Sequence, residues 1–496
     1  MSAEAFDVIV VGCGVAGLSA ACAAREGGAC VLLLERAIRE ERGGNTRYTE
    51  AFLRMKSQDQ VSDDFEEHFA ANAGGYVDPA LVNEMAGDYA NWPSIVRSLS
   101  FADPELISAF GEAAGPTLNW LTRFGISFDF FPTPFLTQST PRMSPRGGGL
   151  ALVEGLTAAA GKLGVEIRYE TVAHDLVQNE LGDISGLVAI GPGSRRYTIP
   201  APSVILASGG FEGNPEMLAH YLGPRAINLR PVARGGHYNK GEGIRMALRI
   251  GAAPCGDFGS YHAEPIDPRS GISEPAIFIF PYGILVNEQG ERFVDEAVGT
   301  VDATYESVTR RIYEQSNGIA YVILDAKIDD VPNKQLAIRT DQPPIEADTI
   351  VGLAKKLAIP AAKLEATVRL YNEACIRAPF KALERDGLST EGIVPKKSNW
   401  ARPIDRGPFQ AYPIISANVF TFGGLKVNGQ AQVLNVNGDP IPGLYAAGEV
   451  VGIYYKTYTG STSVLKGAVF GRLAGIDSAR RAAGPKAAAK GAMHPI

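Results

Sequence analysis

Histidine and cysteine are scarce in this chain, and neither follows a pattern that binds metal or haem. The 496 residues contain six histidines and five cysteines, with no CxxC, CxxCH or HExxH spacing. Zinc centres and c-type haem attachment need such spacings, so no metal site is predicted. The GxSxG turn of serine hydrolases is also absent. An odd number of unpaired cysteines is typical of a reducing compartment, and we expect a cytoplasmic protein.

Positive charge is limited as well. Lysine and arginine number 47 against 54 acidic residues, which gives a net charge of -7, and no basic run occurs. This balance argues against nucleic acid or an anionic membrane as a partner. Residues 8–24 lack charge, but Gly12, Gly14 and Gly17 interrupt them and the acidic Glu4 and Asp7 precede them. We therefore predict a buried strand, turn and helix here, not a signal peptide or membrane span.

The amino-terminal segment has the pattern of a dinucleotide-binding turn. Residues 6–11 form an apolar run typical of a strand buried on both faces. GxGxxG follows at Gly12, Gly14 and Gly17, then an alanine-rich helix and a second apolar run ending at Glu35. Such glycines make the tight turn, let a pyrophosphate approach the backbone and let the helix pack on the strand. The helix N-terminus attracts phosphate, and Glu35 can accept hydrogen bonds from ribose hydroxyls.

Two more glycine turns extend this predicted site. Residues 43–46 (GGNT) supply one, and a strand ending in AAGE supplies another at Gly448 and Glu449. Three separated turns that converge on one ligand fit the long flavin dinucleotide FAD better than NAD.

The rest of the chain alternates helical and strand patterns. Residues 64–124 show helical spacing, while residues 277–286 and 320–324 are strand candidates. Two Asn-Gly pairs, at 428–429 and 437–438, favour tight hairpins near the carboxyl end.

The whole chain resembles the FAD-dependent fumarate reductase and succinate dehydrogenase flavoprotein superfamily. The matching stretches run from about residue 6 to residue 477 in the family order and include VIVVGCGVAGLSAA, ERGGNTRYT, VILASGGFEGN, KGEGIRMALRIGA, GILVNEQGERFVDE and IPGLYAAGEVVG. FTFGGLKV and the segment at 458–475 look most similar to the tricarballylate dehydrogenase branch, whereas KTYTG is similar to a segment of 3-ketosteroid dehydrogenases.

The resemblance implies an α/β fold with a Rossmann-like FAD-binding domain that is split in sequence. Its parts would be residues 1–256 and 421–496, with an inserted α+β capping domain at 257–420. Family members with covalent flavin carry histidine where this chain has Asn45, so non-covalent FAD is expected. The implied cofactor residues are Gly12, Gly14, Val15, Ala16, Gly17, Glu35, Arg36, Ala37, Gly43, Gly44, Asn45, Thr46, Arg47, Ser208, Gly209, Gly210, Gly448, Glu449, Ser463, Val464 and Leu465.

The resemblance also limits the chemistry. Fumarate reductases carry an arginine acid at the position of Thr300, a histidine at that of Phe420 and an arginine near Thr459, and all three are missing here. A C4-dicarboxylate needs cations at both ends, so fumarate reduction is disfavoured. Ketosteroid dehydrogenases have a tyrosine base at the Thr300 position, which is absent too. Their ketone-holding tyrosine matches Tyr458, with the backbone N–H of Thr462 as its partner.

The base that removes a substrate proton is left open among several side chains. A threonine hydroxyl at position 300 is too weak to serve alone at pH 7. His262 aligns roughly with a substrate-binding histidine of fumarate reductases. Further candidates in the predicted cap are Tyr261, Tyr282, Asp302 and Tyr305. The candidate catalytic residues are therefore Tyr458, Thr462, His262, Thr300 and Tyr282.

Cationic side chains suggest an anchor for one carboxylate. A guanidinium binds a carboxylate through two parallel hydrogen bonds, which a ketone alone does not require. Arg142 and Arg146 flank a turn in a loop whose family counterpart lies near substrate. The candidate substrate-binding residues are Arg142, Arg146, Arg234, Phe420 and Lys456.

We therefore expect a dehydrogenase that desaturates a CH–CH bond beside a carbonyl, in a small and cyclic keto or carboxylate substrate. The alternatives are a tricarballylate-like polycarboxylate dehydrogenase, a fumarate-reductase-like enoate reductase, or a flavin electron-transfer subunit without substrate chemistry. The electron acceptor is open between oxygen, a quinone and another flavoprotein.

Overall fold

A parallel sheet forms the base of the protein. The computed structural model describes residues 6–73, 79–88, 91–97, 99–131 and 142–484. The six strands lie in the order β18 (Gln432–Leu434), β19 (Pro440–Ala446), β9 (Ser203–Leu206), β1 (Val8–Val11), β2 (Val31–Leu34) and β5 (Glu166–Arg168). All pairs are parallel except β18 with β19. Every residue of β1, β2 and β9 is buried, as an uninterrupted apolar run requires in a sheet covered on both faces.

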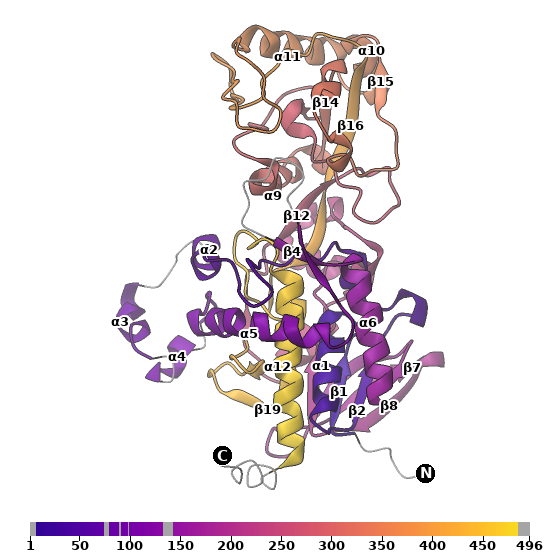
Figure 1. Ribbon diagram of the computed structural model, residues 1–496, viewed down its shortest axis with the longest axis vertical. Coiled ribbons are helices and arrows are strands. Elements are labelled where there is room, and N and C mark those ends of the chain that lie inside the picture. The colour runs from indigo at the N-terminus through magenta and orange to yellow at the C-terminus, as the bar shows by residue number, and fades with distance from the viewer. Residues whose placement is uncertain (1–5, 74–78, 89–90, 98, 132–141, 485–496) are drawn as a thin grey trace.

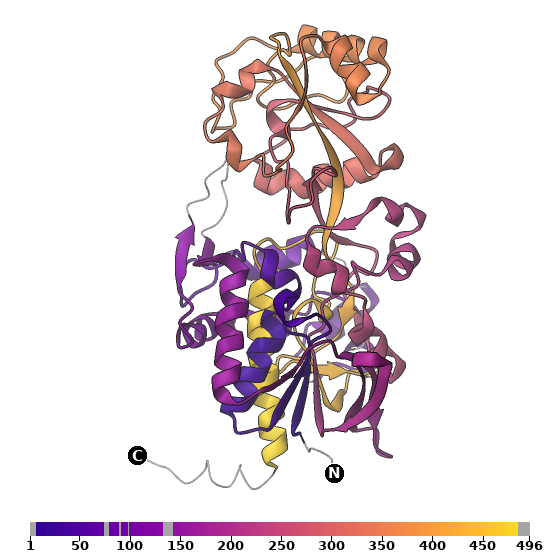
Figure 2. The same ribbon diagram turned by 90° about the vertical axis from the view of Figure 1, so that its right-hand side faces the viewer.

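Two helices lie side by side against this sheet, α1 (Val15–Glu26) and α12 (Ser463–Ala483) (Figures 1 and 2). Small residues at a spacing of four let their backbones approach closely. A Cβ atom at Gly471 would stand 2.2 Å from the Ala16 carbonyl oxygen, and one at Gly475 would stand 2.3 Å from that of Ala20. This packing brings the N-termini of α1 and α12 to the same end of the sheet, although the two helices lie more than 400 residues apart in sequence.

A second lobe stands above the first and is built on the long strand β16 (Phe409–Thr421), which runs between the lobes (Figure 2). Strands β14 (Ile319–Leu324), β12 (Tyr261–Ile266), β15 (Ile345–Ala347) and β10 (Arg230–Pro231) pair with β16, and β13 (Ile284–Val286) pairs with β14. Three helices surround this sheet: α9 (Val301–Tyr313), α10 (Ile350–Leu357) and α11 (Ala361–Ala374).

Smaller elements complete the lower lobe. An antiparallel sheet joins β6 (Val172–Gln178), β7 (Ile184–Gly191) and β8 (Arg195–Pro200), and two short pairs join β3 (Phe128–Phe131) with β4 (Arg142–Pro145) and β11 (Pro254–Cys255) with β17 (Gly424–Leu425). The remaining helices are α2 (Phe65–Asn72), α3 (Val82–Met85), α4 (Ser94–Arg97), α5 (Pro104–Thr122), α6 (Gly148–Leu163), α7 (Pro215–Leu222) and α8 (Glu242–Arg249).

The α/β class and the split Rossmann-like domain with its inserted cap agree with the sequence prediction. The strand predicted at residues 277–286 is shorter, because only β13 joins the sheet and residues 280–282 form a 3₁₀ turn. Pro281 lies in that turn and lacks the N–H that a strand ladder needs. The domain boundaries at 256 and 420 stay a prediction. Within the described ranges, no helix is long and apolar enough to span a bilayer.

Candidate active site

The glycine turn between β1 and α1 opens a cleft at the C-terminal edge of the parallel sheet. Gly12 has a φ of +105°, and a Cβ there would stand 2.3 Å from the Ala207 carbonyl oxygen. A Cβ at Gly17 would stand 1.9 Å from the Gly12 carbonyl oxygen, so the turn closes only with glycine at both positions. The first turn of α1 carries no acidic residue and offers its N–H groups to the cleft.

Glu35 and Arg36 follow β2 and line the same cleft. The Glu35 carboxylate accepts hydrogen bonds from the backbone N–H groups of Cys13 at 2.9 Å and Ala37 at 2.8 Å. Burial raises the pKa of Glu35, although these two bonds oppose the rise. Arg36 donates to the Tyr238 carbonyl oxygen at 2.8 Å and pairs with Glu242 at 2.7 Å.

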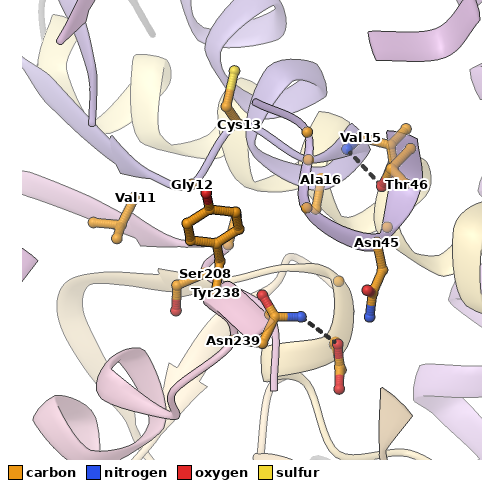
Figure 3. A pocket seen from close by; sticks show the side chains of 18 of the residues that line it. Val11, Gly12, Cys13, Val15, Ala16, Asn45, Thr46, Ser208, Tyr238 and Asn239 are labelled. Carbon is orange, nitrogen blue, oxygen red and sulfur yellow. Dashed lines mark hydrogen bonds between the residues drawn. The ribbon is translucent and has the colours of Figure 1, made fainter. Parts of the chain in front are cut away.

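The other walls come from distant segments (Figure 3). Thr46 accepts a hydrogen bond from the Val15 N–H at 3.2 Å, which ties the second glycine turn to the start of α1. Among the described residues, the Asn45 Oδ1 and Ser208 Oγ atoms are buried without a hydrogen-bond partner. A helix N-terminus, a ribose acceptor and orphaned polar atoms around one cleft fit the polar parts of FAD.

Most predicted cofactor residues line this cleft. The lining includes Gly12, Gly14, Val15, Ala16, Glu35, Arg36, Ala37, Gly43, Gly44, Asn45, Thr46, Ser208, Gly209, Gly448, Glu449, Ser463 and Val464. Gly17, Arg47, Gly210 and Leu465 lie outside the lining. Gly17 acts through packing, whereas the Arg47 guanidinium pairs with Glu154 at 3.1 Å.

Several lining residues were not predicted, among them Tyr238, Asn239 and Lys466. The Lys466 ammonium is buried in the first turns of α12 and donates to the Val451 carbonyl oxygen at 2.9 Å. Burial lowers the pKa of Lys466 to about 7. An ordinary-looking lysine within a helix gives no sequence signal of this role.

A separate cavity of about 790 Å³ lies between the two lobes and adjoins the cleft. Asn45, Val419, Phe420, Ser463 and Val464 line both spaces. A cofactor in the cleft would therefore border a substrate in the cavity.

Tyr458 stands where the cavity meets the N-terminus of α12. Its hydroxyl oxygen accepts the backbone N–H groups of Thr462 and Ser463, each at 2.9 Å, and its O–H donates to Ser463 Oγ at 3.0 Å. The ring packs 4.5 Å from His262 and 5.0 Å from Phe420, measured between ring centres. Two N–H groups at the N-terminus of α12 thus donate to the Tyr458 phenol, and the phenol has its own O–H to donate.

A group of polar side chains lines the cavity beside Tyr458. The Tyr305 hydroxyl lies 3.1 Å from His262 Nε2, and His262 Nδ1 lies 3.5 Å from Glu306 Oε2. Glu306 also accepts from Arg310 at 2.8 Å and from the Tyr458 N–H at 3.3 Å. Burial alone would raise the pKa of Glu306, but His262 and Arg310 bring it below its ordinary value.

Glu306 was not predicted, although its spacing gave a signal. Asp302, Tyr305 and Glu306 occur at i, i+3 and i+4 on α9, which places them on one helix face. Burial, followed by the charges of Glu264 and Glu306, raises the pKa of Tyr305 well above its ordinary value. Thr300 is the N-cap residue of α9 and lines the cavity.

Five predicted substrate or catalytic residues do not line the cavity. One of them, Thr462, still donates its backbone N–H to the Tyr458 hydroxyl at 2.9 Å. Tyr282 is a correction, because its 3₁₀ turn directs the hydroxyl to the Ala382 carbonyl oxygen at 2.5 Å, inside the cap core. Arg146 is exposed and pairs with Asp129 at 2.7 Å. Arg234 is exposed and pairs with Glu41, and Lys456 is exposed. These three are corrections too, since solvent and surface acids already satisfy their charges.

Comparison with known proteins places this geometry among flavoproteins. A family profile described as "FAD binding domain" matches residues 7–465. The chain is 29% identical over 489 residues to a vinyl phenol reductase of Lactiplantibacillus plantarum, covering 92% of each chain. It is 28% identical over 368 residues to a 4-oxocyclohexanecarboxylate 2-dehydrogenase of Sinomonas cyclohexanicum, covering 68% of this chain and 62% of that one.

Two solved structures have a similar fold. An open flavocytochrome c3 fumarate reductase gives a TM-score of 0.76 at 25% identity, covering 97% of this chain and 79% of that one. A 3-ketosteroid-Δ4-(5α)-dehydrogenase from Rhodococcus jostii RHA1, solved with 4-androstene-3,17-dione, gives 0.68 at 26% identity, covering 96% and 97%.

Proposed function

The chain belongs to the fumarate reductase and succinate dehydrogenase superfamily of FAD-dependent oxidoreductases that act on CH–CH bonds, and on that premise we propose that it desaturates a ketone. The observation that carries this proposal is the Tyr458 hydroxyl, which accepts two N–H groups at the start of α12 and lines the cavity. FAD, when bound, supplies the acceptor for the hydride that leaves the substrate β-carbon.

Tyr458 would hold the ketone oxygen. Two accepted N–H bonds polarise the phenol and make its O–H a stronger donor. When the O–H turns from Ser463 Oγ to the substrate oxygen, it stabilises the negative charge that forms there as the α-carbon loses its proton. The C–H bond beside the ketone therefore becomes acidic when the ketone oxygen accepts the hydrogen bond from Tyr458.

Tyr305 and His262 would receive that proton. The Tyr305 oxygen accepts the α-proton as its own proton passes to His262 Nε2, 3.1 Å away. Glu306, beside His262 Nδ1, stabilises the resulting imidazolium. The α-proton and the β-hydride together leave a carbon–carbon double bond conjugated to the ketone. Because the pKa of Tyr305 is raised, its hydroxyl stays protonated near neutral pH, and it can take up the α-proton only while its own proton passes to the histidine.

Asn45 offers an amide at the position where covalent members carry histidine, so we propose that FAD is held without a covalent bond. Acid precipitation should then release all of the flavin into the supernatant. Flavin that stays with the precipitate would contradict this.

Reduction of an enoate, in which the hydride moves in the opposite direction, is the second candidate because relatives include reductases. Three compounds separate the candidates. Anaerobic addition of 4-oxocyclohexanecarboxylate should bleach the flavin of a desaturase and yield the conjugated ketone. Tricarballylate should bleach it if the enzyme oxidises polycarboxylates. Fumarate should reoxidise a chemically reduced enoate reductase. An electron-transfer subunit would respond to none of these compounds.

A further inference from the structure

We propose that the cavity selects a keto acid with a single carboxylate, which Arg54 and Arg142 hold beside Tyr458. The wall that contains Glu264 and Glu274 offers no second anchor, because Arg339 there is already paired with Glu274 and Glu50. The inference rests on the proposed desaturation for the ketone end of the substrate, and it names the group at the other end.

Arg54 is the buried half of this anchor. The residue is 4% exposed and lines the cavity. Its Nη2 pairs with Asp64 Oδ2 at 2.6 Å and its Nη1 donates to the Gly460 carbonyl oxygen at 3.4 Å. Nε is buried and has no acceptor in the part of the chain that the structure describes. A buried charged N–H without an acceptor is costly, so a ligand oxygen is expected there.

Arg142 and Arg54 both lie close to Gly460. A Cβ atom placed on Gly460 would lie 4.0 Å from Arg142 Nη2, and the carbonyl oxygen of the same glycine accepts a hydrogen bond from Arg54. Arg142 Nη2 lies 3.9 Å from Asp302 Oδ2, which is too long for a hydrogen bond, and its buried Nε also lacks an acceptor among described residues. Both guanidinium groups are thus short of acceptors, and Gly460 lies two residues after Tyr458.

Two guanidinium groups and two carboxylates share this part of the molecule, because Asp64 pairs with Arg54 at 2.6 Å and Asp302 lies 3.9 Å from Arg142. His68 also lines the cavity, and burial, then Arg54 and Arg142, lower its pKa against the opposing effect of Asp64. Arginine presents paired donors that match a planar carboxylate. We therefore assign one substrate carboxylate to these two guanidinium groups, each of which has an Nε without an acceptor among described residues.

Another wall of the cavity offers a second carboxylate only a guanidinium that is already paired. Arg339 pairs there with Glu274 at 2.9 Å and with Glu50 at 3.2 Å, and Glu264 adds a third carboxyl group that is 6% exposed. Burial and the charge of Glu274 raise the pKa of Glu264 well above its ordinary value, and the pKa of Glu274 rises to about 7, so these groups tend to be protonated near neutral pH. Because Arg339 already has its carboxylate partners, a second substrate carboxylate would lose water there without gaining a free cation.

The test measures binding and does not depend on desaturation. Cyclohexanecarboxylate has no ketone, so it reports the anchor alone through its perturbation of the bound flavin's absorption. Arg142→Gln and Arg54→Gln should each weaken its binding about tenfold or more, as loss of a charged hydrogen-bond pair predicts. The exposed Arg146→Gln is the matched control and should bind as the parent does.

Two further measurements keep the proposal falsifiable if Arg54→Gln does not fold. Asp302→Asn removes a carboxylate that competes for Arg142 and should tighten binding of the same probe. Cyclohexane-1,4-dicarboxylate should bind the parent protein more weakly than the monocarboxylate does, because its second carboxylate loses water without gaining a free cation. Equal binding in all variants, or no binding by the parent protein, would overturn the inference. Normal cyclohexanecarboxylate binding without flavin bleaching by the keto acid would instead refute the desaturation and leave the anchor standing.

Discussion

Tyr458→Phe removes one oxygen atom from the point where the ketone would sit. That oxygen accepts two backbone N–H groups at 2.9 Å, and its own O–H is the donor we assign to the ketone. Loss of one preorganised donor to a developing oxyanion costs about 100- to 1,000-fold in rate, or about 2.7–4 kcal/mol in the activation free energy. The two helix N–H groups remain, so the reaction should be slowed within that range and not abolished.

Anaerobic stopped-flow measurement of flavin reduction by 4-oxocyclohexanecarboxylate tests this prediction. Bound FAD should stay at the parent level, because the ring and its packing against His262 are kept. Tyr455→Phe is the control, since the Tyr455 hydroxyl contacts Ser100 and Cys255 and does not line the cavity. A Tyr458→Phe rate equal to that of the control would remove Tyr458 from the mechanism.

Other variants probe different parts of the account. Gly17→Ala should lose FAD and lower the melting temperature, because its Cβ would lie 1.9 Å from the Gly12 carbonyl oxygen. The control is Gly161→Ala, whose Cβ would enter open space on an exposed helix face. It should stabilise the folded protein by up to about 1 kcal/mol. Tyr305→Phe should slow flavin reduction at least about 100-fold with FAD retained, and a loss below tenfold would exclude Tyr305 from the proton path. Burial lowers the pKa of Lys466 to about 7 from 10.5, so the folded state binds fewer protons than the unfolded state between these values. This group's contribution to stability therefore rises with pH across that window, and Lys466→Met should raise the melting temperature most at pH 7 and least near pH 10. An equal rise at both values would contradict the assignment.

Local patterns predicted the cofactor cleft well. The glycines of the first turn and Glu35 fall within one strand–turn–helix–strand unit, where sequence spacing fixes spatial position. Tyr458 and Thr462 were predicted from the resemblance to 3-ketosteroid dehydrogenases, and the Thr462 N–H does donate to the Tyr458 hydroxyl at 2.9 Å.

Local patterns did not predict the cavity, because its walls join segments that are distant in sequence. The Arg54 guanidinium contacts the carbonyl oxygen of Gly460, which lies 406 positions later in the chain. The Glu306 carboxylate on α9 lies beside the His262 ring on β12. Tyr282 was misplaced because residues 277–286 look like one continuous strand, whereas the 3₁₀ turn at Pro281 directs the phenol into the cap core.

The most direct test of the central claim is an anaerobic titration of the FAD-loaded protein with 4-oxocyclohexanecarboxylate, with the product identified. We predict stoichiometric bleaching of the flavin and one equivalent of the ketone desaturated beside its carbonyl. A flavin that stays oxidised with this compound, yet is reoxidised by an enoate after chemical reduction, would contradict the claim.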